Sequence, residues 1–379
     1  MIAQKLNDER QEALARTNPA FGPRRLKLGT FCTNVSGGAC MSTMAGVLRA
    51  TWADVTATAR LADEMQFEAI VPLGRWQGFG GVTRHNEESF EAMTFCALVT
   101  AQTRNPSVFA TIHVPTMHPV LAAKQATTID HAGGGRFTLN VVCGWNRPEI
   151  ELFGSPMLEH SERYAMAEEW ITLLKRLWTE EAPFDHAGRY FHLHRACLKP
   201  RPIQPYPALM SASGSAIGKA FAAKHFDIVF AGVSASDPAT VREKLEGYRT
   251  YARQEFGRDL KVWTTAYVIV GDTEADARRQ FEHCVHEKGD RVAAGNFMEG
   301  MGANTRSLPP DLIRRIGDDM IAGYGSFPLV GTSEQVAEKL QMLADNGADG
   351  VLLTWPAFID GMARFKAEVL PLLVQAGLR

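Results

Sequence analysis

The sequence contains no C-x-x-C pair and no block of basic residues. Its six cysteines occur singly along the 379 residues, which argues against a disulfide framework or a zinc knuckle and favours a protein of the reducing cytoplasm. The formal net charge is −2, so we expect no nucleic-acid partner, because phosphate binding needs concentrated lysine and arginine. His192 and His194 share one face of a predicted strand without a third ligand nearby, and we expect no metal site.

Long hydrophobic runs are also missing. The N-terminal segment MIAQKLNDERQEALART is charged and has no apolar core, so it does not predict a signal peptide. No apolar run reaches the ~18 residues that a membrane-spanning helix requires, and we expect no membrane association. Residues 1–25 precede the first predicted strand, and we expect them to form a loosely attached N-terminal arm.

What the sequence does contain is an alternation of strand-like and helical segments. Hydrophobic residues make up 45% and charged residues 22%, which is typical of a globular protein. Strand followed by helix predicts a parallel sheet, and about eight such units predict a closed barrel. We therefore predict the α/β class, with residues 26–379 as a single (β/α)8 TIM-barrel domain. The predicted strands are 27–32, 68–74, 106–114, 136–144, 208–214, 227–232, 261–271 and 350–355.

Two stretches interrupt this alternation. Residues 180–205 predict a small hairpin followed by extended, proline-rich chain. Residues 288–330 contain Gly, Asn, Pro and Met without a clear period. Long insertions of this kind in a compact domain are typically functional, so we expect the second to act as a lid.

The chemistry of a TIM barrel lies at the carboxyl ends of its strands. Here those ends are rich in Gly, Ser, Thr, Asn and Trp. They lack the paired carboxylates of a glycosidase and the Ser–His–Asp set of a hydrolase. Small polar groups beside aromatic rings suit a planar cofactor that is held by hydrogen bonds.

The segment MSASGSAIGKA (210–220) runs from a strand into a helix. Ser213, Gly214 and Ser215 then lie at the helix N-terminus, where backbone N–H groups and hydroxyls bind phosphate. The alternative is an ordinary serine N-cap with a glycine turn. The residues alone leave both interpretations open.

Several single residues also have both a functional and a purely structural interpretation. Asn140 interrupts an apolar run, so its amide either faces a ligand or bonds to neighbouring backbone. Cys143 is more simply a small buried hydrophobe. His113 falls where the third strand ends, near a ligand, whereas His85 is expected to be a solvated loop histidine. Arg163 and Tyr164 begin a helix; they either form a charged first turn with an aromatic ring packed below it or reach back to an anionic ligand.

Several stretches together resemble one family. They are NVSGG (34–38), GFGG (78–81), ATIDHAGGGRFTLNVVCGWN (126–146), LEHSERY (158–164), LKPRPIQ (198–204) and GVLLTW (350–355). They resemble the bacterial luciferase-like, two-component FMN-dependent monooxygenases, in the branch of the dimethylsulfone and pyrimidine monooxygenases. The resemblance covers roughly residues 26–376 and implies a TIM barrel with insertions.

The resemblance also implies roles for individual residues. Thr111 and Asn140 would be catalytic, holding dioxygen near the flavin and donating hydrogen bonds to the peroxide formed there. The implied cofactor-binding residues are Gly74, Arg75, Thr111, Asn140, Glu149, Arg163, Tyr164, Ser213, Gly214 and Ser215. Residues expected near the substrate are Asn34, Met41, His113, Trp145 and Trp355.

The activity implied is oxygenation of a small organic substrate by O₂ and reduced FMN (FMNH₂), with cleavage of a C–S or C–N bond. A separate NAD(P)H:flavin reductase would supply the FMNH₂, because the chain shows no second G-x-G-x-x-G unit. The dimethylsulfone type is the first expectation. The alternatives are a pyrimidine-type ring-opening monooxygenase, a deazaflavin (F420)-dependent oxidoreductase and a non-catalytic flavin-binding relative. The family also implies a homo-oligomer, either dimer or tetramer.

Overall fold

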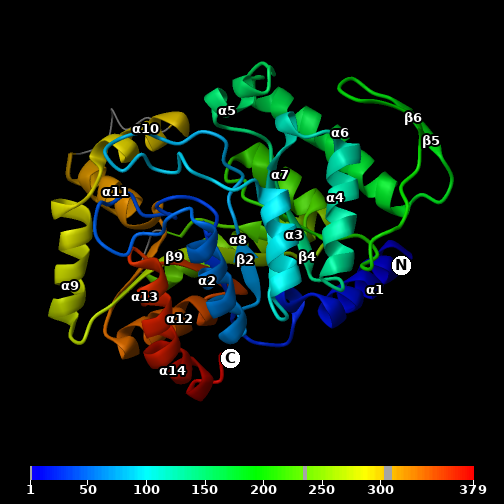
Figure 1. The fold of residues 1–379 in the computed structure, drawn as a ribbon. Helices are drawn as coiled ribbons and strands as arrows, with labels where there is room; N and C mark the ends of the chain where they lie inside the picture. The colour runs from blue at the N-terminus through cyan, green and yellow to red at the C-terminus, as the bar shows by residue number, and fades with distance from the viewer. Residues whose placement is uncertain (1, 234–236, 303–309) are drawn as a thin grey trace.

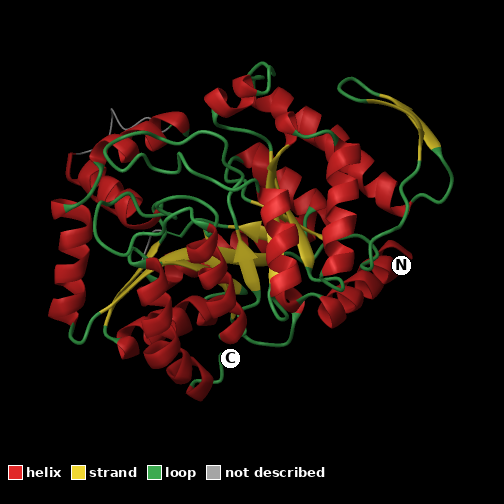
Figure 2. Cartoon of the chain, viewed as in Figure 1, coloured by secondary structure: helices red, strands yellow, loops and turns green. Residues whose placement is uncertain are grey.

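Eight parallel strands close into a barrel with helices around it, in a computed structural model that describes residues 2–233, 237–302 and 310–379 (Figures 1 and 2). The (β/α)8 prediction is confirmed. Each strand pairs with its neighbours in parallel register, and β8 pairs with β9 to complete the ring. The barrel strands, in spatial order, are β1 (Lys27–Phe31), β2 (Ala69–Val71), β3 (Ser107–His113), β4 (Phe137–Val142), β7 (Ala208–Ser211), β8 (Ile228–Phe230), β9 (Lys261–Val270) and β11 (Gly350–Thr354).

The strands are buried on both faces, which explains their nearly continuous apolar runs. The helices that cover the barrel begin at side-chain caps such as Thr51, which accepts a hydrogen bond from the Asp54 N–H. They are α2 (Trp52–Glu64), α3 (Ala92–Gln102), α4 (Pro119–Ala132), α5 (Arg147–Leu152), α6 (His160–Thr179), α7 (Ala216–His225), α8 (Pro238–Phe256), α12 (Ser333–Asp345), α13 (Phe358–Arg364) and α14 (Leu370–Gln375).

The N-terminal segment is not a loosely attached arm, contrary to the sequence expectation. It forms helix α1 (Ile2–Thr17) and the short turn η1 (Pro19–Phe21). Arg10 Nη2 donates to the buried Asp227 carboxylate over 2.8 Å, and Leu14 is completely buried. Because Asp227 directly precedes β8, α1 packs at the amino-terminal end of the barrel. The close approach of Thr17 also explains Gly135 (φ +90°), where a Cβ would lie 2.8 Å from the Thr17 side chain.

The stretch near 180–205 contains an antiparallel hairpin, which projects from the body of the molecule (Figure 2). Its strands are β5 (Phe184–Ala187) and β6 (His192–Ala196). Glu169 on α6 accepts the backbone N–H groups of Arg189, Tyr190 and Phe191, so one carboxylate secures the tip of the hairpin.

The described part of the 288–330 stretch is largely helical, although its sequence shows no clear period. It contains α10 (Arg291–Gly300), α11 (Pro310–Gly323) and a strand that the sequence did not predict, β10 (Phe327–Gly331). Residues 303–309 of this stretch lie outside the described residues. Strand β9 continues beyond the barrel, and β10 pairs with this extension from Phe327↔Ala266 to Gly331↔Val270.

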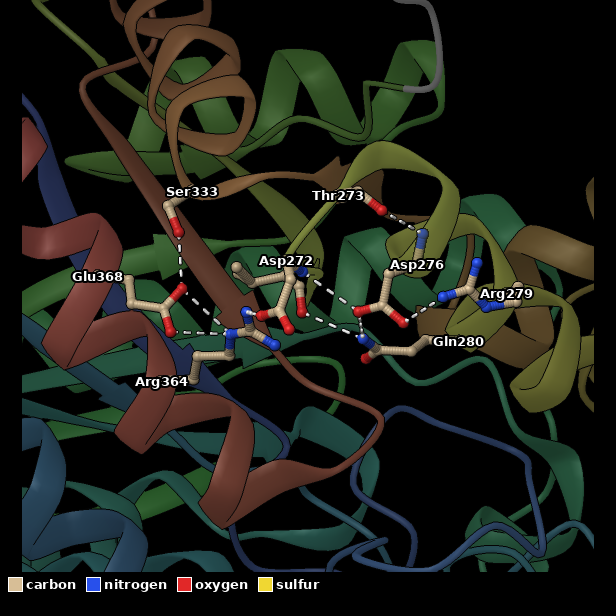
Figure 3. Close-up of polar contacts among 9 residues, drawn as sticks. Asp272, Thr273, Asp276, Arg279, Gln280, Ser333, Arg364 and Glu368 are labelled. Carbon is tan, nitrogen blue, oxygen red and sulfur yellow. Dashed lines mark hydrogen bonds and ion pairs between the residues drawn. The ribbon is translucent and has the colours of Figure 1, made fainter.

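A polar network anchors the end of the β9 extension (Figure 3). Arg364 on α13 pairs with Asp272, directly after β9, and its Nε donates to Glu368 over 3.1 Å. Asp276 on α9 (Glu274–Glu282) accepts the Asp272 N–H over 3.2 Å. The π-helical turns η3 (His283–Glu287) and η4 (Phe365–Val369) continue α9 and α13. This network holds α9, which leads through η3 to α10, against the barrel.

Candidate active site

A cavity of about 270 Å³, here called the inner cavity, lies at the mouth of the barrel. All eight barrel strands contribute to its wall, which is mainly apolar. Among the described residues that line it, Arg75 is the only one with a permanently charged side chain. The strand residues in the wall are Phe31, Val71, Thr111, His113, Asn140, Val142, Met210, Phe230, Thr265 and Leu352.

Asn140 and Thr111 lie opposite each other on β4 and β3 and both line the inner cavity. Asn140 Nδ2 donates to Thr111 Oγ1 over 3.1 Å, and Thr111 Oγ1 donates to the Pro72 carbonyl over 2.7 Å. A carbonyl only accepts, so the Thr111 proton is committed to Pro72. Asn140 keeps its second N–H, and its Oδ1 has no partner among the described residues. This arrangement revises the expectation that both side chains donate to bound oxygen, because only Asn140 retains a donor.

Arg75 and Glu149 form a buried ion pair, here called the charge pair, beside the inner cavity. Arg75 Nη1 donates to Glu149 Oε1 over 3.0 Å, and the side chains are 4% and 1% exposed. The same oxygen accepts the backbone N–H groups of Trp76 and Gln77 at 2.7 and 3.2 Å. Arg75 lines the cavity and Glu149 does not. The Glu149 carboxylate thus holds Arg75 and the chain after β2, and its expected contact with the cofactor stays a prediction.

His113 extends the polar side of this wall. Its Nδ1 lies 4.0 Å from Glu149 Oε2. Burial lowers the pKa of His113 to about 4, although the Glu149 carboxylate opposes that shift. The imidazole is therefore neutral at pH 7, and His113 adds no charge to the cavity.

Four aromatic rings, here called the aromatic roof, pack together at the inner cavity, and three of them, Trp145, Phe297 and Tyr324, line its wall. Phe79 and Trp145 are nearly parallel, with ring centroids 6.2 Å apart, and Phe297 stacks on Tyr324 at 4.5 Å. The Arg75 guanidinium lies 4.6 Å from the Phe79 ring centroid and 5.4 Å from that of Trp145. These rings come from the loops after β2 and β4, from α10 and from the end of α11, so the roof joins segments far apart in the sequence.

The histidine that we expected in a solvated loop, His85, is instead buried against the roof. His85 Nε2 lies 2.7 Å from the Tyr324 hydroxyl, which donates its own hydrogen to Asn86 Oδ1. His85 Nε2 is therefore the donor, which defines a neutral tautomer with the hydrogen on Nε2. Burial, with the nearby Arg75 charge, lowers the pKa of His85 to about 3. The contact fixes Tyr324 to the loop after β2.

The serine segment between β7 and α7 lies next to the inner cavity, which Ala212 lines. Ser215 Oγ accepts the Gly218 N–H over 3.1 Å, so it caps α7, while Ser213 Oγ pairs with Ser211 Oγ at 2.9 Å. The Tyr164 hydroxyl lies at the same turn, where a Cβ on Gly218 would approach it to 2.5 Å. A Cβ on Gly214 would meet no described atom within 4 Å. The segment thus combines the cap with an open, hydroxyl-lined helix N-terminus.

A larger, outer cavity of about 830 Å³ adjoins the inner one, and Trp145 and Met301 line both. Its other walls come from the loop after β2, the start of α5 and α10. Arg163 lines this cavity and donates to the Gly144 carbonyl, and its Nε has no partner among the described residues. Gly74 contributes to the inner cavity, where a Cβ would lie 2.7 Å from the Thr111 carbonyl oxygen.

Three residues expected near the substrate lie elsewhere. The Asn34 amide is committed to backbone groups, because both of its N–H groups donate to the Leu73 and Phe90 carbonyls and its Oδ1 accepts the Leu73 N–H. Met41 is completely buried in the apolar cluster that also contains Phe79 and Phe297, so it packs behind the aromatic roof and does not line the inner cavity. Trp355 lines a different cavity of about 220 Å³, beside Arg364 of the network in Figure 3. These three residues therefore lie outside the wall of the inner cavity, and their contact with substrate stays a prediction.

Conversely, sequence reasoning did not single out several residues of the inner cavity. Phe297, Met301, Tyr324 and Ser326 all come from the 288–330 stretch, and Phe230 ends β8. The sequence predicted that this stretch would cover the site, but without a recognisable period it gave no register.

The model of the luciferase-like monooxygenase family matches residues 26–350. The chain belongs to this family. It is 31% identical over 354 residues to the pyrimidine monooxygenase of Cronobacter turicensis, covering 92% of each chain. It is 30% identical over 358 residues to the FMNH₂-dependent dimethylsulfone monooxygenase of Pseudomonas putida, covering 92% of this chain and 95% of that one. The predictions of the family and of a monooxygenase enzyme are confirmed.

The fold is also found among solved structures. A riboflavin lyase superposes with a TM-score of 0.83 at 20% identity, over 93% of this chain and 92% of that one. In the described parts of the chain, no helix is long and apolar enough to cross a membrane. Within those same ranges, no group of three or more His, Cys, Asp or Glu side chains could hold a metal ion.

Proposed function

We propose that the protein uses FMNH₂ and O₂ to oxygenate a small organic molecule, with cleavage of a C–S or C–N bond. The observation that carries the proposal is the inner cavity, where Asn140 offers a free N–H between apolar walls. Relatives that act on dimethylsulfone and on pyrimidines are similar to this chain at 30% and 31% identity, so both substrate types are candidates. The sulfone type remains our first choice because of the NVSGG and LKPRPIQ segments.

The residues present fit a flavin. The inner cavity has apolar walls from opposite sides of the barrel, which suits a planar ring system. A buried polar atom with no hydrogen-bond partner among the described residues, Asn140 Oδ1, lies in the wall and suits a heteroatom-rich edge. The start of α7, with Ser213, Ser215 and Tyr164, would hold the phosphate. Bound FMNH₂ would supply the electrons for the reaction of O₂ with the substrate.

The protein's own contribution is positioning, hydrogen bonding and exclusion of water. Asn140 is held by Thr111, so its second N–H is oriented without the need for rearrangement. The charge pair places the Arg75 guanidinium at the cavity wall. The aromatic roof covers the reacting centre, and we propose that the 288–330 stretch closes as a lid when cofactor and substrate bind.

The proposal includes partners that the chain does not contain. FMNH₂ would come from a separate NAD(P)H:flavin reductase, and the protein would assemble as a dimer or tetramer. The competing function is hydride transfer with deazaflavin F420 on the same barrel. In that case the enzyme would neither consume O₂ nor label its product with oxygen.

The test is a reconstituted assay with ¹⁸O₂. The purified chain, FMN, NADH and a generic flavin reductase are incubated with dimethylsulfone or uracil, and products are identified by mass spectrometry. We expect one ¹⁸O atom in the product and no reaction without the reductase. Turnover that persists without reductase, or an unlabelled product formed with F420, would overturn the proposal.

A further inference from the structure

We infer that the charge pair Arg75–Glu149 acts as a charge filter, which selects uncharged substrates that present a hydrogen-bond-accepting oxygen to Arg75. The inference rests on the proposed function and deepens it, because it concerns the charge of the substrate rather than the reaction. It separates sulfones, amides and neutral heterocycles from sulfonates, carboxylates and plain hydrocarbons.

The described wall of the inner cavity carries a single permanent charge. Arg75 is the only permanently charged side chain among its described lining residues, and the neighbouring His113 is neutral. Charged side chains that are absent from the inner wall, Arg147, Arg163 and Glu299, line the outer cavity. A substrate that reaches the inner cavity therefore meets one cation.

Glu149 neutralises the Arg75 charge. Glu149 Oε1 lies 3.0 Å from Arg75 Nη1, and both side chains are almost completely buried. The second carboxylate oxygen, Oε2, accepts no hydrogen bond from the described residues, and the nearby His113 is neutral, so no further cation balances Glu149. An anionic substrate would enter with an uncompensated negative charge and lose its hydration, which is unfavourable in a buried site.

Arg75 also has a hydrogen-bond donor, Nε, that no described residue uses. Arg75 Nη1 donates to Glu149, whereas Nε is buried and has no partner among the described residues. Buried donors without acceptors are costly, so a ligand oxygen at this position is favoured. Phe79 and Trp145 flank the guanidinium and limit where that oxygen can lie. A sulfonyl or carbonyl oxygen fits, whereas a hydrocarbon leaves the donors unpaired.

The test compares pairs of compounds that are similar in size and differ in charge. Dimethylsulfone is compared with methanesulfonate, and uracil with orotate. Affinities for the FMN-loaded protein are measured by calorimetry, and kcat/KM is measured in the reconstituted assay. We expect the neutral member to bind at least tenfold more tightly in one or both pairs. Equal or tighter binding of the anions, or failure of both neutral compounds to bind, would overturn the inference.

Substitutions test the roles of Glu149 and Arg75 individually. Glu149→Gln leaves the Arg75 charge uncompensated, so we expect the neutral-to-anion affinity ratio to fall at least tenfold. Glu151→Gln is the matched control on the same helix, because Glu151 is exposed and pairs only with Arg147 among the described residues. Near-UV circular dichroism checks that each variant is folded, and the wild-type ratio remains decisive if Glu149→Gln does not fold.

Arg75→Met distinguishes substrate binding from cofactor binding. We expect KM for the neutral compound to rise at least tenfold while the Kd for FMN changes less. If Arg75 serves FMN alone, the Kd for FMN will rise and the substrate KM will not, which would contradict the inference. Binding that shows the expected preference without any turnover would support the charge filter and count against the proposed function.

Discussion

The Asn140–Thr111 pair allows one prediction to be worked out in detail. If only Asn140 retains a donor for bound oxygen, the two side chains will not be equivalent. Asn140→Ala removes that donor, whereas Thr111→Val removes only the oxygen that orients it. The isosteric Thr111→Val variant is therefore the matched comparison.

The structure sets the expected magnitudes. A donor aimed at developing charge contributes about 2.7–4 kcal/mol to catalysis, so Asn140→Ala is expected to lower kcat by roughly 10²–10³. Loss of an orienting neutral hydrogen bond is worth about 1 kcal/mol, so Thr111→Val is expected to cost roughly fivefold. Neither side chain carries a charge, and both variants are expected to remain folded.

The assay follows product and hydrogen peroxide for each NADH consumed in the presence of a flavin reductase. Asn140→Ala is expected to divert most of the NADH into hydrogen peroxide, and Thr111→Val only a minor part. An unchanged coupling ratio in Asn140→Ala would remove Asn140 from the oxygen site. Equal losses in the two variants would show that Thr111 also donates directly, against the hydrogen bond to Pro72.

Three further predictions address stability and cofactor binding. Arg10→Ala leaves the buried Asp227 carboxylate without its strongest partner and is expected to lower the free energy of unfolding by about 3–5 kcal/mol. Denaturant titration measures this loss, and Arg16→Ala, at an exposed site on the same helix, is the control. A loss no larger than that of the control would contradict the buried pairing. Ser213→Ala is expected to weaken FMN binding severalfold and to lower Tm slightly, because the buried Ser211 hydroxyl loses its partner; an unchanged Kd would remove Ser213 from the phosphate site. The folded-state pKa of His113 is about 4 against 6.5 ordinarily, so between these values the unfolded chain binds a proton that the folded chain does not, and stability falls as the pH falls. His113→Gln should reduce that slope by up to ~1.4 kcal/mol per pH unit, and denaturation curves with the wild-type slope would refute the shift.

The sequence predicted the barrel because parallel strands carry a local signal. Each barrel strand is a short apolar run followed by a helix, and all eight predicted ranges contain a barrel strand. Strand β10 was missed because it lies in a stretch without a clear period. Helix α1 was misjudged because Arg10 finds its partner, Asp227, 217 residues away.

The sequence likewise predicted some residues of the functional site and not others. Asn140 was recognisable as a polar residue in an apolar strand, and the strand-to-helix pattern pointed to the serine segment. Thr111 and Arg75 came from the family resemblance. Asn34 carries a similar local signal, yet its amide is consumed by neighbouring backbone. Whether a polar side chain at a strand end faces a ligand depends on which backbone groups surround it, and those groups come from other strands.

The sequence by itself thus determined the fold class, the family and the elements that carry the site. Only the tertiary structure decided that Glu149 serves Arg75, that His85 is buried against Tyr324 and that the Thr111 proton belongs to Pro72. Each of these contacts joins residues between 39 and 239 positions apart. Local patterns encode burial and secondary structure, whereas the pairing of charges and hydrogen bonds is a property of the folded barrel.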